Sequence, residues 1–368
     1  MKRQLIFFFL AVFTTLFTEV AVYAQADLQP VAIVRLTRSE PITVRQLKTE
    51  AEKALWPVLS QRLNRSPTAA ELAREVQNFS MDDRRQLLEV TINERLALQA
   101  AERDRITVTD NELNQQIAPL REQMSQAIGR PPTEEEFALA VKAETGQDVP
   151  AFRESLRRRL IIQKYMMAQK GDILNNVKQP TEAEVLNIYN LSKASMVRPE
   201  TVRFSMIQVA YGPDAASKNR AKELIDRLNR EIGTNASRFD EAVMRGQAPN
   251  SGYMAGDGGY LPRNLMAQQR AGQDFVDVAF SLKQGEVSRV IEGIPGYQII
   301  KITETLPQKA LELDEIAEPG TRITVRQYIT MNLAEQRMME AQNQATMELI
   351  TELRTGNPFQ IMENNLNW

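Results

Sequence analysis

The chain has 368 residues, 43% of them hydrophobic and 25% charged, which is typical of a globular protein with two or three hydrophobic cores. Its formal charge of -2 provides no positive field to hold a polyanion, so we expect no nucleic acid partner. Cysteine and histidine are absent, which excludes disulfides, thiolate nucleophiles, Ser-His dyads and almost every zinc site. No G-x-x-x-x-G-K-[ST] loop is present, so we expect no nucleotide-driven cycle. We also expect no other cofactor and no metal.

Residues 1–24 have the three-part layout of a secretory signal. Lys2 and Arg3 form a basic start, an apolar run extends from Leu5 to Phe17, and small residues end at Ala24. A membrane anchor is the alternative, but the run is shorter than the roughly 20 residues that a spanning helix needs. We therefore expect cleavage after Ala24 and a periplasmic mature chain.

Residues 25–198 are predicted to form a helical domain that begins with a short strand at Val31–Leu36 and a polar turn. Four Thr-x-x-Glu sequences indicate helix starts, because a capping box pairs these side chains with the first backbone N–H groups. They begin at Thr68, Thr109, Thr133 and Thr181. Apolar residues at helical spacing after these starts predict stripes that face a core. Pro119 lies in one stripe and is expected to kink or split its helix.

Residues 199–306 are predicted to form a small α+β domain with its own core. A strand is expected at Val202–Tyr211, followed by an amphipathic helix and a glycine-dense loop over residues 246–263. A short helix around "DFVDVAFSL" and two strands, Ser288–Glu292 and Tyr297–Thr303, complete this unit.

Residues 307–368 contain one long predicted helix, from about Thr324 to Arg354, and a tail that could add a strand. Such a helix cannot bury its apolar stripe alone, so we expect it to pack on the N-terminal helices. The α+β domain would then be an insertion between two segments of one helical domain. The fold class predicted for the chain is mainly helical α+β. Exchange of the terminal helix between two chains also stays open, and would produce a dimer.

Four segments resemble the parvulin-type peptidyl-prolyl isomerase domain in order and approximate spacing: "VRFSMIQV", "AGDGGYLPR", "FVDVAFSLKQGEVS" and "GYQIIKITE". The flanking sequences "EPIT" and "LLEVTINERLALQAAERDRITVTDNEL" resemble the N-terminal chaperone domain of SurA and of the related PrsA foldases. The resemblance implies a helical chaperone domain with one parvulin-like domain inserted in it.

The departures from the parvulin pattern concentrate at its active site. Met206 and Gln298 stand where the resemblance implies histidines, and Ala248, or Pro249, stands where it implies an acid or a cysteine. In the glycine turn, Gly258 replaces an apolar residue of the pocket wall.

Two aromatic residues complete the candidate peptide-binding cleft that the resemblance implies. Phe275 matches the aromatic residue that lines the proline pocket, and Tyr260 follows the glycine turn; for each, simple core packing is the alternative. We expect Gln298 to find a hydrogen bond, because an amide in an apolar strand needs one. The catalytic residues, if the domain is active, stay unknown.

The resemblance implies an ATP-independent periplasmic chaperone that binds unfolded outer-membrane or secreted chains, with a catalytically impaired parvulin-like domain. An active peptidyl-prolyl isomerase is the main alternative, because catalysis of X-Pro rotation needs no covalent step or metal. A structural role in an envelope assembly is a third hypothesis.

Overall fold

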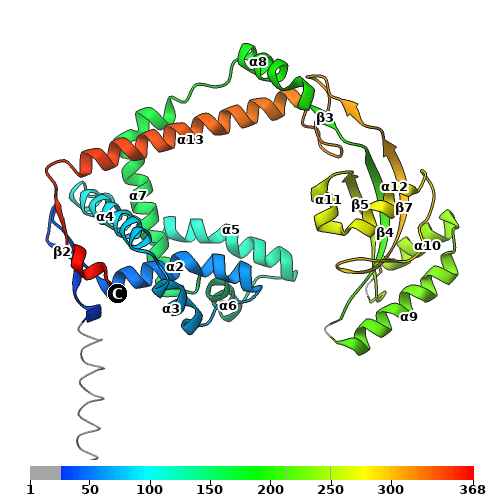
Figure 1. Cartoon of the computed structure of the whole chain (residues 1–368), viewed down its shortest axis with the longest axis horizontal. Helices are drawn as coiled ribbons and strands as arrows, with labels where there is room; N and C mark the ends of the chain where they lie inside the picture. Colours follow the sequence, from blue (N-terminus) through cyan, green and yellow to red (C-terminus); the bar gives the residue numbers. More distant parts are fainter. Residues whose placement is uncertain (1–25, 213, 249) are drawn as a thin grey trace, which may run out of the picture. The chain divides into compact units, whose positions relative to one another are not determined.

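The computed structural model describes residues 26–212, 214–248 and 250–368 (Figure 1). The chain divides into two compact units: the first combines the segment up to Val177 with Met338–Trp368, and the second is Lys178–Arg337. The N- and C-terminal segments therefore share one unit, as predicted, and the mainly helical α+β fold class is confirmed. The expected signal sequence lies outside the described residues, and the exact domain boundaries stay predictions.

The first unit is built mainly from helices that follow the predicted starts. They are α2 (Val44–Leu63), α3 (Ala69–Gln77), α4 (Met81–Arg103), α5 (Asp110–Ile128), α6 (Glu134–Thr145), α7 (Val149–Asn175) and the second half of α13 (Val325–Leu353). The four predicted capping boxes are present, the last of them on α8 (Glu182–Ser192) in the second unit. Three further boxes, at Thr43, Ser80 and Asp214, use Gln46, Asp83 and Ser217 in the third position and so lie outside the Thr-x-x-Glu pattern.

Pro119 was predicted to kink or split its helix; the split is wrong, because α5 continues through the proline, and the kink stays a prediction. Residues on both sides of the proline pack into one cluster, in which Leu113 and Ile117 lie against Phe137 of α6. Leu120, beyond the proline, packs against the same cluster. A common core thus holds both halves of the helix in place despite the missing N–H.

A three-stranded antiparallel sheet joins the two ends of the first unit. It consists of β1 (Pro30–Val34), β2 (Glu40–Thr43) and β9 (Phe359–Ile361) in the order β2-β1-β9. The predicted terminal strand is therefore confirmed as β9, followed by a 3-10 turn, η2 (Glu363–Leu366). The region expected as a polar turn contains β2 instead, because pairing with β1 orders it.

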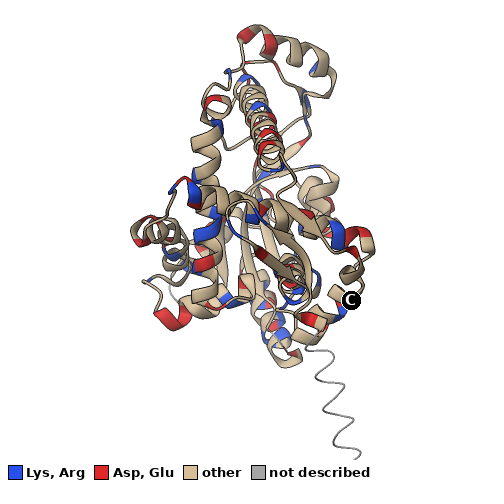
Figure 2. Ribbon diagram, turned by 90° about the vertical axis from the view of Figure 1, so that its left-hand side faces the viewer, with Lys and Arg blue, Asp and Glu red and all other residues tan. Residues whose placement is uncertain are grey.

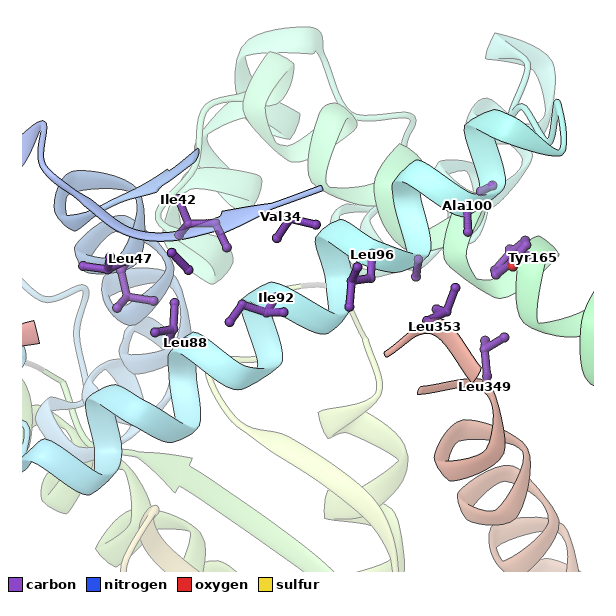
Figure 3. Packing of buried hydrophobic residues seen from close by; sticks show 14 of the residues in the cluster. Val34, Ile42, Leu47, Leu88, Ile92, Leu96, Ala100, Tyr165, Leu349 and Leu353 are labelled. Carbon is purple, nitrogen blue, oxygen red and sulfur yellow. The ribbon is translucent and has the colours of Figure 1, made fainter. Parts of the chain in front are cut away.

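The second half of α13 packs into the core of the first unit (Figure 3). Leu349 and Leu353 are buried in the cluster that contains Leu96, Ala100 and Tyr165. The ammonium group of the buried Lys170, on α7, lies 2.6 Å from a carboxylate oxygen of Glu352 on α13. The long helix thus finds the partner that its apolar stripe requires.

The second unit contains a four-stranded antiparallel sheet in the order β5-β4-β7-β6. Its strands are β5 (Met254–Pro262), β4 (Thr201–Ala210), β7 (Gly296–Leu306) and β6 (Ile291–Glu292). Helices α9 (Ala215–Ile232) and α10 (Ala236–Gly246) pack on one face, and α12 (Gln273–Ser281), preceded by α11 (Leu265–Ala271), packs on the other. A two-stranded pair, β3 (Val197–Arg198) with β8 (Lys309–Ala310), and the 3-10 turn η1 (Lys193–Ser195) complete the elements.

The glycine-dense segment was predicted to be a loop, and this prediction is partly wrong. Its second half is the edge strand β5, which pairs with β4 along its length through one irregularity beside Phe204. Glycines weaken a strand in isolation, but pairing with the ten-residue central strand β4 supplies the backbone hydrogen bonds that order it.

Acidic and basic residues are interspersed along the individual helices rather than segregated (Figure 2). Both signs nearly balance in the sequence, with 45 Lys and Arg against 47 Asp and Glu. Among the described residues, no helix combines the length and the apolar character that crossing a bilayer requires.

Candidate functional site

The parvulin-like face of the second unit brings Met206 and Gln298 onto neighbouring strands. Met206 of β4 lies opposite Ile300 of β7, and Gln208 lies opposite Gln298. Because alternate residues of a strand share a face, Met206, Gln208 and Gln298 all lie on the same side of the sheet. This is the side that α12 covers.

Gln298 makes one hydrogen bond, through its amide nitrogen, whereas its buried Oε1 has no partner among the described residues. Its Nε2 donates to Oε1 of Gln208 over 3.1 Å, and the two side chains are only 6% and 8% exposed. The Oε1 atom of Gln298 lies beside Gly293, where a Cβ would come within 2.6 Å of it. Position 293 therefore has no room for a side chain unless Gln298 moves.

Sequence reasoning missed Gln208, although it is the partner of Gln298. The available signal was its place two residues after Met206 on the same strand, which puts it on the same face. Neither amide titrates near neutral pH, so this pair can position groups by hydrogen bonding but cannot exchange a proton as an imidazole does.

Phe275 lies in the apolar cluster beside this pair and is 3% exposed. Its ring meets that of Phe204 edge-on, with centroids 5.4 Å apart. A Cβ at Gly258 would fall 2.2 Å from the Phe204 ring. The glycine at position 258 therefore leaves no gap, because Phe204 fills that space from the neighbouring strand.

Tyr260 and Ala248 do not join the other candidates. Tyr260 lies opposite Arg203 on β4, on the other face from Phe204 and Phe275. Its hydroxyl donates to Glu304 over 2.7 Å, and this contact raises the pKa of the Tyr260 phenol. Ala248 is exposed in the turn after α10, and Pro249, its alternative, lies outside the described residues.

A second candidate site is a cavity of about 650 Å³ in the first unit, a size that suits a small ligand or a few side chains. Its walls come from α2, α4, α7 and the second half of α13, with the end of α6 at one side. The apolar residues that line it are Ala54, Pro57, Leu87, Val90, Ala97, Ile162, Met166, Leu349, Ile350 and Leu353. The sequence predicted these helical stripes but gave no sign that they leave a cavity.

Most of the polar side chains around the cavity already have partners within the protein. Glu50 pairs with Lys53, and Glu94 pairs with Arg158. The hydroxyls of Thr91 and Thr145 each donate to the carbonyl four residues earlier in their helix. Filling the cavity therefore requires apolar surface from a ligand and few specific hydrogen bonds.

Among the described residues, the candidate sites contain no cluster suited to a metal ion. Within this part of the chain, no three Asp and Glu side chains gather closely enough to hold one. The parvulin-like face offers apolar side chains and two amides, and the cavity offers apolar surface beside polar side chains that are mostly paired.

Two family models match this chain. Residues 2–166 match a SurA-like N-terminal domain, and residues 180–318 match a PPIC-type PPIase domain. Among curated proteins, the chaperone SurA of Chromohalobacter salexigens is 25% identical over 66% of this chain and 52% of its own length. The foldase protein PrsA of Clostridium botulinum is 22% identical over 85% of this chain and 83% of its own length.

Among solved structures, a SurA-like chaperone of Campylobacter jejuni covers 91% of this chain, with 13% identity and a TM-score of 0.40. The chain spans about half the length of the SurA relatives that it matches. Together, the two matched domains and the curated relatives identify the chain as SurA/PrsA-like, with a SurA-like N-terminal domain followed by a parvulin-type domain.

Proposed function

We propose that this protein is an ATP-independent chaperone of the periplasm that binds unfolded outer-membrane or secreted polypeptides. The cavity of the first unit carries the proposal, because its apolar walls can take up the side chains of an unfolded chain. The names of the relatives, chaperone SurA and foldase PrsA, agree with this role.

The paired polar groups around the cavity support a receptor with little sequence preference. A site whose buried polar groups need a partner from the ligand rejects ligands that lack it. Here Glu94 and Thr91 are already paired within the protein, so an apolar segment of almost any sequence loses little by binding. Such tolerance is what a chaperone for many different clients needs.

The parvulin-like domain is proposed to bind peptides weakly and to catalyse little or no isomerisation. Met206 offers no hydrogen at its sulfur, and Gln298 already donates to Gln208. Phe275 and Phe204 pack against each other and are almost fully buried, so this face offers a peptide little apolar surface. In this proposal the domain is a second binding surface that adds avidity.

The experiment measures the aggregation of an unfolded client protein without nucleotide, in the presence of the wild-type chain or a cavity variant. Val90 lines the cavity and is 59% exposed, so Val90→Asp adds a charge to the wall without burying it in the core. Val58 is equally exposed, at 59%, but does not line the cavity, which makes Val58→Asp a matched control.

We expect Val90→Asp to weaken protection by about tenfold, because the charge must be desolvated when a client fills the cavity. Val58→Asp should protect like the wild type. Absence of protection by the wild-type chain would reject the chaperone proposal. Equal protection by both variants would place client binding elsewhere.

A further inference from the structure

The outer edge of β5 is unusual among the sheet edges that the structure describes. β5 has nine residues, whereas the opposite edge of its sheet, β6, has two. In the other sheets, β9 has three residues, β3 and β8 have two each, and the four-residue β2 contains Pro41. Edge strands are usually protected from pairing with another chain because they are short or contain proline. Among these edge strands, β5 is protected least.

The first half of β5 also lacks the charges that protect an edge. Asp257 is its one charged residue, and this carboxylate already pairs with Arg203, with 2.6 Å between the nearest atoms. The bulge at Gly258 and the terminal Pro262 both lie in the second half of the strand. None of these features therefore blocks an added strand from pairing with β5 along Met254–Asp257.

Exposed backbone is what this half presents to the solvent. Gly256 is partly exposed, and because glycine has no side chain, that exposed surface is backbone. β4 occupies one side of β5, so alternate N–H and C=O groups of β5 point to the other side. These groups are complementary to one partner above all, an extended polypeptide backbone.

The glycine also leaves space for a large side chain. No atom lies within 4 Å of the position that a Cβ of Gly256 would occupy. Gly256 lies opposite Met206, and Met254, which is 57% exposed, lies two residues away on the same face. A bulky apolar residue on an added strand, placed beside Gly256, would cover both methionines.

We propose that β5 binds an extended segment of a client polypeptide, which adds a fifth strand to the sheet along Met254–Asp257. The segment recognised has alternating apolar side chains, one of them seated beside Gly256. The inference rests on the proposed function for the identity of the client, but its chemistry, main-chain pairing at a strand edge, is separate from the cavity of the first unit.

The test uses the full chain and a fluorescent peptide of about eight residues, in which phenylalanine alternates with threonine between terminal lysines. Two further peptides carry N-methyl groups on one or the other set of alternate amides. Only one set can face β5 in a paired strand, so one methylated peptide should bind about tenfold more weakly and the other like the parent. Equal affinities of all three peptides would overturn the proposal.

Two protein variants locate the binding site. Met254→Lys places a lysine on the edge and should weaken binding of the parent peptide by about tenfold. Met331→Lys changes a methionine of α13 with nearly the same exposure, 59% against 57%, and should leave binding unchanged. Hydrogen exchange of the Met254–Asp257 amides should slow when the peptide binds. Wild-type affinity in Met254→Lys, with unchanged exchange in this segment, would also overturn the proposal.

The remaining outcomes separate this inference from the proposed function and from self-association. If the wild type prevents client aggregation but the methylated peptides bind alike, only the edge proposal fails. If the edge pairs and no anti-aggregation activity exists, only the chaperone proposal fails. Concentration-dependent dimers of the wild type that Met254→Lys abolishes, without peptide binding, would assign the edge to a second copy of the chain and overturn the client proposal.

Discussion

The ring of Phe204 occupies the space into which any side chain at Gly258 would project, with a hypothetical Cβ only 2.2 Å from the ring. The two residues belong to paired strands, β4 and β5, so the conflict is built into the register of the sheet. Phe204 in turn packs edge-on against Phe275. The apolar wall of the cleft is therefore formed by Phe204 of the central strand β4, and not by a residue of the glycine turn.

Restoring an apolar residue in the turn should destabilise the domain. Gly258→Leu forces Phe204 out of its contact with Phe275, and overpacking of this kind costs about 1 to 3 kcal/mol. Thermal unfolding should show a lower Tm for Gly258→Leu. The double variant Gly258→Leu with Phe204→Ala should recover part of the loss, because the smaller residue vacates the space. A single variant as stable as the wild type would contradict the assigned packing.

The isomerase prediction concerns the same cleft. We expect the wild-type chain to accelerate X-Pro rotation negligibly on a peptide panel that varies the residue before proline. The rate should also stay flat between about pH 6 and pH 8, because the chain has no histidine to titrate there. A parvulin-like rate on any peptide would show that the domain has kept its catalyst.

The corresponding gain-of-function variant combines Met206→His with Gln298→His, and should recover some turnover. Met206 and Gln298 lie on neighbouring strands of one face, so the imidazoles would be close together. Replacing Gln298 removes the partner of Gln208, and a histidine at 298 can donate to Gln208 in its place. The single variant Ala248→Asp is the control, because this exposed position alone should restore nothing.

The sequence allowed the local features of the fold to be predicted better than the contacts between distant segments. Capping boxes such as Thr109 with Glu112 depend on residues three positions apart, and the structure has each one predicted. β5 could not be recognised from its own glycine-rich sequence, because what orders it is pairing with β4 about fifty residues earlier.

For the candidate site, too, local features were predicted and features that depend on distant contacts were not. Motif alignment predicted Met206 and Gln298 on neighbouring strands that face one cleft, with Phe275 of the short helix on its wall, and the structure brings all three to the same side of the sheet. The alignment placed Tyr260 in the same cleft, where the bulge and the register of β5 turn it to the other face. The cavity of the first unit depends on how separate helices pack, and no local pattern reveals such a gap.

Removing Met338–Trp368 should unfold or aggregate the first unit. The deletion takes away Leu349 and Leu353, which are buried against Leu96 and Ala100, and also β9, which pairs with β1. A truncation of this kind exposes apolar stripes to water, which is unfavourable and leads to unfolding or aggregation. Light scattering and circular dichroism of the truncated chain provide the measurement.

The control for this truncation is the second unit alone, Lys178–Arg337. It should fold, because its sheet and both layers of helices that cover the sheet lie within it. Its cooperative unfolding would confirm that the second unit has its own core. Equal solubility and Tm of the full and truncated chains would contradict the shared core of the two terminal segments.

Acid should destabilise the helices by protonating the glutamates of their capping boxes. Glu71, Glu112 and Glu136 each have a pKa lowered to about 2, chiefly by hydrogen bonds from Arg65, Lys164 and Arg130 respectively. The backbone N–H of Thr181 does the same for Glu184, whose pKa is also about 2. A carboxyl group whose pKa is lower in the folded state stabilises that state above its ordinary pKa of about 4.5. This stabilisation is lost as the pH falls from there toward about 2.

The expected result is a Tm that falls between about pH 5 and about pH 3, with a smaller fall in Glu136→Gln. Glutamine can still accept the hydrogen bond from the Thr133 N–H, so the variant keeps the capping box of α6 but removes the titrating group. Glu135→Gln, in the same first turn but outside the box, is the control and should keep the pH dependence of the wild type. An equally reduced fall in Tm with pH in both variants would indicate that general charge repulsion, rather than protonation of Glu136, causes the acid sensitivity.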